Sequence, residues 1–194
     1  MRSLLKRLIR DEQGQDVIEY ALLAAGISIA REPASAQWLL PAEVHDLIPI
    51  VEDKELWINM PIDERPFTSA FIMQNNIRVS ILAFGSGLTA GLLTFWVLMQ
   101  NGLILGGLLG LTSYYGIGWD LANFVIGHGV IELSVIFMAG GSGLMLGWAI
   151  LRPGLMRRRD ALAQAAQTSV RLLIGAVPML IIAGHDGGGD PLDP

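Results

Sequence analysis

Between Val79 and Leu151 the chain runs for 73 residues without one lysine or arginine. The only acidic or imidazole side chains in this stretch are Asp120, His128 and Glu132. A soluble domain cannot cover its core with so little polar surface, so the stretch predicts helices that cross a membrane. We therefore expect an all-α, polytopic helical protein of the cell membrane, with about four membrane segments, one of them broken or re-entrant.

Composition agrees with this class and excludes others. Of the 194 residues 52% are hydrophobic and none is cysteine, which removes disulfides, thiolate metal sites and cysteine nucleophiles. No basic face with interleaved aromatic residues is present, which argues against a nucleic-acid partner. No Ser-His-Asp order or phosphate-binding glycine loop stands between a strand and a helix, so we expect no enzyme, no catalytic residue and no cofactor. A histidine and a glutamate one helical turn apart are too few ligands for a catalytic metal site.

Four regions follow one another along the chain. Residues 1–30 form a basic N-terminal segment whose ten-residue apolar run is too short to cross a bilayer. Residues 31–76 form a lead-in with eight acids and five prolines, in which we expect only short helices, such as an amphipathic one over 42–48. Residues 77–184 form the helical transmembrane domain, and residues 185–194 a disordered tail.

Glycines recur at four-residue spacing in the transmembrane domain, where we expect apolar helices at 77–100, at about 102–118 and at 169–184. Small residues so spaced give a flat face on which two membrane helices can approach closely. Packing within the chain is the favoured interpretation, and a homo-oligomer built on these faces is the alternative. The glycines concerned are Gly87 and Gly91, Gly102, Gly106 and Gly110, and Gly143 and Gly147.

The apolar region between Asp120 and Leu151 is too long for one crossing. Its 32 residues would make about 48 Å of helix, whereas the hydrocarbon core is ~30 Å thick. The helix must therefore break, and Gly127 and Gly129 favour a break beside His128 over the alternative in the glycine-rich residues 140–143. A discontinuous helix at a polar site is typical of transporters.

Charge distribution sets the expected orientation. The basic loop around Arg157, Arg158 and Arg159 is cytoplasmic by the positive-inside rule. If residues 31–76 are also cytoplasmic, three simple crossings would leave this loop outside. Either a segment is re-entrant, or residues 14–30 cross the membrane and residues 31–76 lie outside. We expect the re-entrant arrangement, because the N-terminal apolar run is short.

Glu132 and His128 are the candidate functional pair, since they lie one helical turn apart. One hypothesis is a proton- or ion-responsive pair inside a membrane pathway, with Asp120 near its mouth. The favoured hypothesis is a structural hydrogen bond that fixes helix packing, with Asn75, Asn76 or Ser134 as further partners.

Arg78 stands where we expect the first membrane helix to begin. Its guanidinium can reach lipid phosphate, while Asn75 and Asn76 can cap the helix. The functional alternative is an ion pair between Arg78 and Glu132 across the bundle.

From about residue 65 to 184 the chain resembles the stage II sporulation protein M family of bacterial and archaeal membrane proteins. The resemblance implies a scaffold or subunit of an envelope assembly for cell-wall remodelling, as in sporulation. Its expected partners are the lipid bilayer and other envelope proteins, with wall hydrolases or an ATPase as candidates. The competing hypothesis is a permease-like transport subunit that works with a separate ATPase. The resemblance rests on Asn75-Asn76-Ile77-Arg78, Asn101-Gly102, His128-Gly129-Val130-Ile131-Glu132-Leu133, Gly140-Gly141-Ser142-Gly143, Arg152-Pro153-Gly154 and Ala183-Gly184.

Residues 1–30 resemble the leader of Flp-type type IVb pilins, which prepilin peptidase cuts after a glycine. The matching residues are Gly14, Glu19 and Tyr20. Because the apolar run stops at Ala30, we expect this segment to lie on the membrane surface as a short helix and not in a filament.

Overall fold

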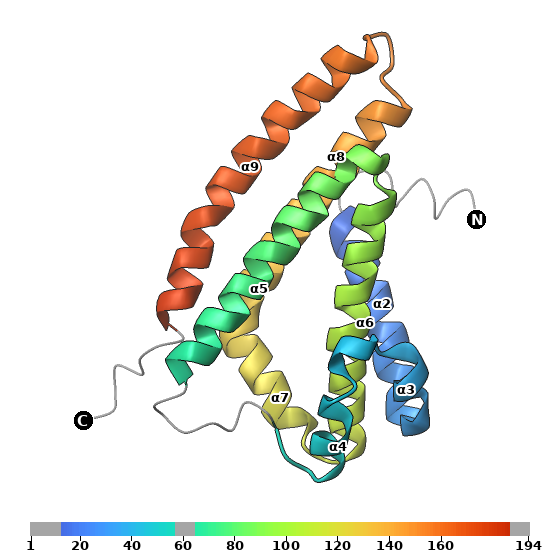
Figure 1. Cartoon of the computed structure of the whole chain (residues 1–194), viewed down its shortest axis with the longest axis vertical. Coiled ribbons are helices and arrows are strands. Elements are labelled where there is room, and N and C mark those ends of the chain that lie inside the picture. Colours follow the sequence, from blue (N-terminus) through green and yellow to red (C-terminus); the bar gives the residue numbers. More distant parts are fainter. Residues whose placement is uncertain (1–12, 57–64, 187–194) are drawn as a thin grey trace.

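The computed structural model describes residues 13–56 and 65–186, and every regular element in these two ranges is helical (Figure 1). The expected all-α class is thereby confirmed. The elements are α2 (Gln13–Arg31), η1 (Pro33–Ser35), α3 (Ala36–Leu39), η2 (Ala42–Val44), α4 (Leu47–Glu52), α5 (Arg65–Gly85), η4 (Ser86–Thr89), α6 (Leu92–Tyr114), α7 (Gly118–Phe124), η5 (Val125–Gly129), α8 (Val130–Leu151) and α9 (Arg158–Asp186).

The five long helices alternate in direction along the chain (Figure 1). α2, α6 and α9 run one way, and α5 and α8 run back. One end of the bundle carries η4 and the turn at residues 152–157, and we call it the loop end. The other end carries α7 and the short helices of residues 32–56, and we call residues 32–56 the cap.

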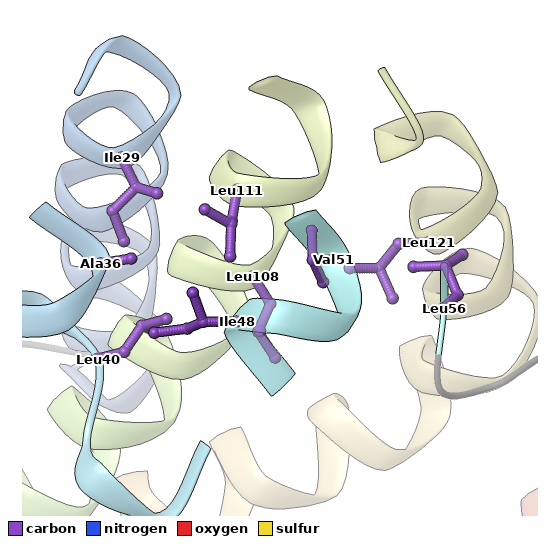
Figure 2. Packing of buried hydrophobic residues seen from close by; sticks show 9 residues of the cluster. All are labelled: Ile29, Ala36, Leu40, Ile48, Val51, Leu56, Leu108, Leu111 and Leu121. Atoms are coloured by element: carbon purple, nitrogen blue, oxygen red, sulfur yellow. The ribbon is translucent and has the colours of Figure 1, made fainter. Parts of the chain in front are cut away.

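The cap closes one end of the α2–α6 pair. Its buried apolar side chains meet the last turns of α2 and α6 and the side of α7 (Figure 2). Short helices are observed within residues 33–52, and the amphipathic one begins later than expected, as α4, whereas residues 65–76 of the expected lead-in belong to the long helix α5. Polar groups meet beside these apolar contacts. The Tyr115 hydroxyl donates a hydrogen bond to Glu52 Oε1 at 3.5 Å. Desolvation raises the pKa of the Tyr115 hydroxyl, and the nearby Glu52 carboxylate raises it further. The cluster comprises Ile29, Ala36, Leu40, Ile48, Val51, Leu56, Leu108, Leu111 and Leu121.

α2 and α6 pack against each other along a glycine face. A Cβ atom added at Gly102 would lie 2.6 Å from the Ile18 carbonyl oxygen, and one at Gly106 would collide with the Leu22 backbone. One at Gly110 would collide with the Gly26 carbonyl. Contacts that advance together along both helices show that the pair is parallel. The four-residue glycine spacing therefore serves packing within the chain, as predicted.

A second glycine face, on α8, receives the turn between α5 and α6. Gly143 lies against Gly87, and Gly147 lies against Gly91. The buried Thr94 hydroxyl donates to the Ala83 carbonyl at 2.8 Å beside this contact. Helix α5, the η4 turn and α6 thus form a hairpin, and the backbone of its turn lies in close contact with the backbone of α8.

The expected helices at 77–100 and 102–118 are wrong in their boundaries. α5 begins at Arg65, because Pro66 falls in its first turn, where a missing N–H costs nothing. The chain then turns back at residues 86–91, where Ala90 and Gly91 have φ of 57° and 82°. Asn101, which was expected to end a helix, lies inside α6 and donates to the Val97 carbonyl.

α9 is a single helix that packs on α8 near the loop end. The Ser169 hydroxyl donates to the Ser142 carbonyl at 3.3 Å, and Ser169 is fully buried. The expected final segment at 169–184 is the second part of this helix, which Pro178 does not end. α9 includes His185 and Asp186, and the remainder of the expected disordered tail lies outside the described residues.

Candidate functional site

The break expected beside His128 is a π-helical turn. α7 ends at Phe124, the turn η5 covers Val125–Gly129, and α8 starts directly after it. A π turn widens the helix by one residue per turn and occurs often at functional sites. The alternative break at 140–143 is not observed, because these residues lie inside α8.

Glu132, in the first turn of α8, accepts a hydrogen bond from a neighbouring helix. The Asn76 side-chain amide of α5 donates to Glu132 Oε2 at 2.6 Å, and both side chains are half-buried. A charge-assisted bond of this kind is stronger than one between neutral groups. Of the further partners expected for Glu132 in the structural hypothesis, Asn76 is the one that donates to its carboxylate.

The pair lies within the length that α6 covers. Leu98 of α6 lies against Gly140 of α8. Glu132 precedes Gly140 by eight residues, which is about 12 Å along α8 toward the cap end. α6 continues past Leu98 for 16 residues, about 24 Å, in the same direction. Along the bundle the carboxylate therefore lies at a level that α6 also spans, and not beyond the end of α6.

Asn75 and Arg78 do not join this pair. Asn75 and Arg78 are exposed, because they are rotated by about 100° and 200° around α5 from Asn76. Among the described side chains no ion pair joins Arg78 to Glu132, so the proposed bridge is not observed. Neither asparagine caps a helix, since α5 begins ten residues before Asn75.

Ser134 and Asp120 also lie apart from the Asn76–Glu132 pair. Ser134 donates to the Val130 carbonyl of its own helix at 2.7 Å. Asp120 is exposed in the first turn of α7. His128 belongs to the π turn, but its side chain is outside the described part of the structure. The expected pairing of His128 with Glu132 is therefore outside the described part as well.

Sequence reasoning missed the α2–α6 contact, which completes the surroundings of this site. A central cluster joins four helices through Val17, Ile18, Ala83, Leu98 and Ile136. The signal was present in the four-residue spacing of Ile18, Leu22 and Gly26, which matches that of the α6 glycines. Because the apolar run of α2 is short, this spacing was not recognised as a helix contact face.

In the described residues every element is helical, and two helices, α6 and α8, are long and apolar enough to cross a membrane. These features are those of the class of α-helical membrane proteins. The model of the stage II sporulation protein M family matches residues 20–185, and the chain belongs to this family.

The chain is also similar to an uncharacterised protein, MJ0793, of Methanocaldococcus jannaschii. The two are 25% identical over 135 residues, which is 69% of this chain and 75% of that protein. No solved structure matches the chain.

The family match changes the interpretation of the N-terminus. It begins at Tyr20, well before residue 65, and so includes most of α2 and the whole cap. The pilin-like leader is not supported. Glu19 and Tyr20 are exposed residues of a helix that packs along α6, and Gly14 lies in the first turn of the same helix.

Proposed function

We propose that this protein is a multi-pass protein of the cell membrane that acts without catalysis, as a scaffold or membrane subunit of an envelope assembly. Family membership supports the assembly role, since the family is defined by a sporulation protein. Expected partners are other membrane or envelope proteins, with wall hydrolases as the first candidates.

The outward apolar surface of α6 and α8 is the observation that carries this proposal. Only 33% and 44% of their most apolar windows are buried within the protein. The core helix of a soluble protein would be buried on all sides. Here large apolar side chains of α6 face outward, as lipid contact requires, among them Leu92, Leu93, Phe95 and Trp96.

Close backbone packing supports a scaffold. Glycine contacts fix α2 against α6 and the α5–α6 hairpin against α8. The Asn76–Glu132 bond adds a polar link between α5 and α8. Such contacts resist relative motion of the helices, because a small shift brings backbone atoms into collision.

A permease-like subunit is the second candidate, and one observation favours it. Glu132 follows a π turn and lies within the length of apolar α6. A carboxylate inside the hydrocarbon layer costs free energy, and such a residue commonly marks an ion or substrate pathway. A separate ATPase would then be the partner.

Affinity purification separates the two candidates. The tagged full chain would be crosslinked in its native membrane, solubilised in detergent and purified, and its partners identified by mass spectrometry. Recovery of wall hydrolases would support the scaffold. Recovery of a stoichiometric ATPase would support the permease subunit.

Glu132→Gln gives an independent test, because glutamine keeps the shape of the side chain and removes its charge. A transport subunit would lose function at normal protein level and with its partner still bound. A scaffold would lose partner binding or be unaffected. Asp160→Asn is the matched control, since Asp160 is an exposed acid in the first turn of α9, outside α5, α8 and the cap.

A further inference from the structure

We infer that α2 crosses the membrane beside α6, so that the cap lies on the extracytoplasmic side with its exposed aromatic side chains in the lipid headgroup layer. This inference rests on the proposed membrane location. It goes beyond that proposal in stating which face of the protein is available to partners in the envelope.

The first argument is the packing of α2. Its contacts with α6 extend from Ile18 at Gly102 to Gly26 at Gly110, in one parallel register. A helix lying on the membrane surface would cross α6 steeply and could not keep this register. If α6 crosses the bilayer, then α2 passes through the same layer beside it. In this register its polar residues Asp16 and Glu19, in its first two turns, lie at the level of residues 100–103 of α6, between the start and the middle of that helix.

The second argument is the distribution of charge between the two ends of the bundle. Of the 13 lysines and arginines, eight either precede α2 or occupy residues 152–159 at the loop end. Only three belong to the cap end, at Arg31, Lys54 and Arg65. The positive-inside rule therefore makes the loop end cytoplasmic. Alternation of α2, α5, α6, α8 and α9 then satisfies the rule without a re-entrant segment (Figure 1).

The third argument is the position of the aromatic side chains. Trp38 of α3 is 88% exposed and Trp119 of α7 is 73% exposed, and both helices lie at the cap end. Trp96 lies near the start of α6, and Trp148 lies near the end of α8, where it stacks on the Arg152 guanidinium at 5.3 Å. Tryptophan is enriched at both membrane–water interfaces, so two such groups at opposite ends mark the two borders of the bilayer. The partner that fits the aromatic surface of the cap is thus the headgroup layer.

Accessibility of single cysteines tests the inference directly, because the chain has no cysteine of its own. Glu43→Cys would report on the cap and Leu155→Cys on the turn at the loop end, where Leu155 is fully exposed. A membrane-impermeant maleimide would be added to spheroplasts and to inverted membrane vesicles that contain the full chain. The cysteine-free parent is the control for background labelling, and labelling in detergent shows that each thiol is reactive.

We expect Glu43→Cys to be labelled severalfold more in spheroplasts than in inverted vesicles, and Leu155→Cys to show the opposite pattern. Labelling of both from one side would show that α2 does not cross. Exchange of the two patterns would overturn the orientation. Protection of Glu43→Cys in both preparations would place the cap inside the lipid and would also overturn the inference.

Failure of the membrane proposal would look different. A chain that an alkaline carbonate wash releases from the membranes is not integral, and both proposals would fall. A chain that stays in the membrane but gives the wrong labelling pattern would contradict only the inference about α2 and the cap.

Discussion

Asn76 is the residue through which α5 holds Glu132. Its amide donates a hydrogen bond to the Glu132 carboxylate, which lies at a level along the bundle that apolar α6 also spans. A neighbouring pair of asparagines on one helix offers a matched comparison, because Asn75 is exposed and Asn76 is half-buried.

Asn76→Leu is expected to destabilise the protein, whereas Asn75→Leu is not. Removal of a donor from a buried charged acceptor costs about 1–3 kcal/mol. Thermal unfolding of the two variants in the same detergent would measure this loss of stability. We expect a lower unfolding midpoint for Asn76→Leu and an unchanged midpoint for Asn75→Leu. Equal midpoints would mean that the bond between Asn76 and Glu132 contributes nothing to stability.

Gly143 shows how little space separates α8 from the hairpin. A methyl group there would collide with the Ala83 carbonyl oxygen and approach the Thr94 hydroxyl. Gly141, two residues earlier on the same helix, has nothing within 4 Å of the same position.

Gly143→Ala is expected to lower the free energy of unfolding, while Gly141→Ala leaves it unchanged or raises it. The first change forces backbone atoms apart, at a cost of about 1–3 kcal/mol for overpacking. The second replaces a flexible residue inside a helix, worth about 1 kcal/mol in favour of alanine. Denaturant unfolding monitored by tryptophan fluorescence would measure both, and a loss of stability from Gly141→Ala would contradict the contact assignment.

At the scale of elements, the contact between α2 and α6 decides the architecture. Gly106 stands in its middle, against the backbone at Leu22. A large side chain at this position cannot be accommodated by rotamer changes, because the atoms it meets belong to the main chain.

Gly106→Leu is therefore expected to displace α2 from α6. Ala25 is buried on α2, so a cysteine placed there reports the displacement. In detergent, Ala25→Cys should resist maleimide in the parent and react in the Gly106→Leu background. Gly85→Leu, which adds the same side chain where nothing lies within 4 Å, should leave the cysteine protected. Equal reaction in the two backgrounds would exclude the packing described for α2.

Some of these elements could be predicted from sequence and others could not. The long apolar stretch without lysine or arginine identified helices in the region of α6 and α8, and the glycines beside His128 predicted a break where the structure has a π turn. The boundary between α5 and α6 was misplaced, because glycines inside an apolar run can be helical or can form a turn. Only the tertiary contact of Gly91 with Gly147 distinguishes the two cases.

The candidate site was predictable in part for a related reason. Glu132 stood out as an acid in an apolar stretch, and Asn76 was among its possible partners. The choice among Asn75, Asn76 and Arg78 depends on the rotation of α5 about its axis. That rotation is fixed by contacts such as the one between Ala83 and Gly143, which sequence spacing on one helix does not reveal.

At the scale of the whole molecule, the glycine faces of α6 and α8 both contact elements of the same chain. A homo-oligomer would therefore need a different surface. The outward face of α6 and the cap remain open for partners, and they differ in chemistry, since the first is apolar and the second is acidic and aromatic.

Trp38 should behave as an interfacial side chain. A variant in which Trp38 is the only tryptophan would be reconstituted in bilayers that carry bromine either near the headgroups or deep in the acyl chains. We expect stronger fluorescence quenching by the shallow bromine. Leu105→Trp on a background without other tryptophans is the control, because it lies near the middle of α6 and should favour the deep bromine. The same depth profile for both positions would place Trp38 away from the headgroup layer.

The parallel pairing of α2 with α6 also constrains how the chain is made. Gly102 follows Ile18 by 84 residues, and α5 is synthesised between them. During synthesis α2 thus emerges from the ribosome long before the glycine face that receives it, while Asp16 and Glu19 make it a poor candidate for stable insertion alone. If α2 crosses the membrane as we infer, its insertion must wait for α6, so this part of the bundle is completed only after α6 has been made.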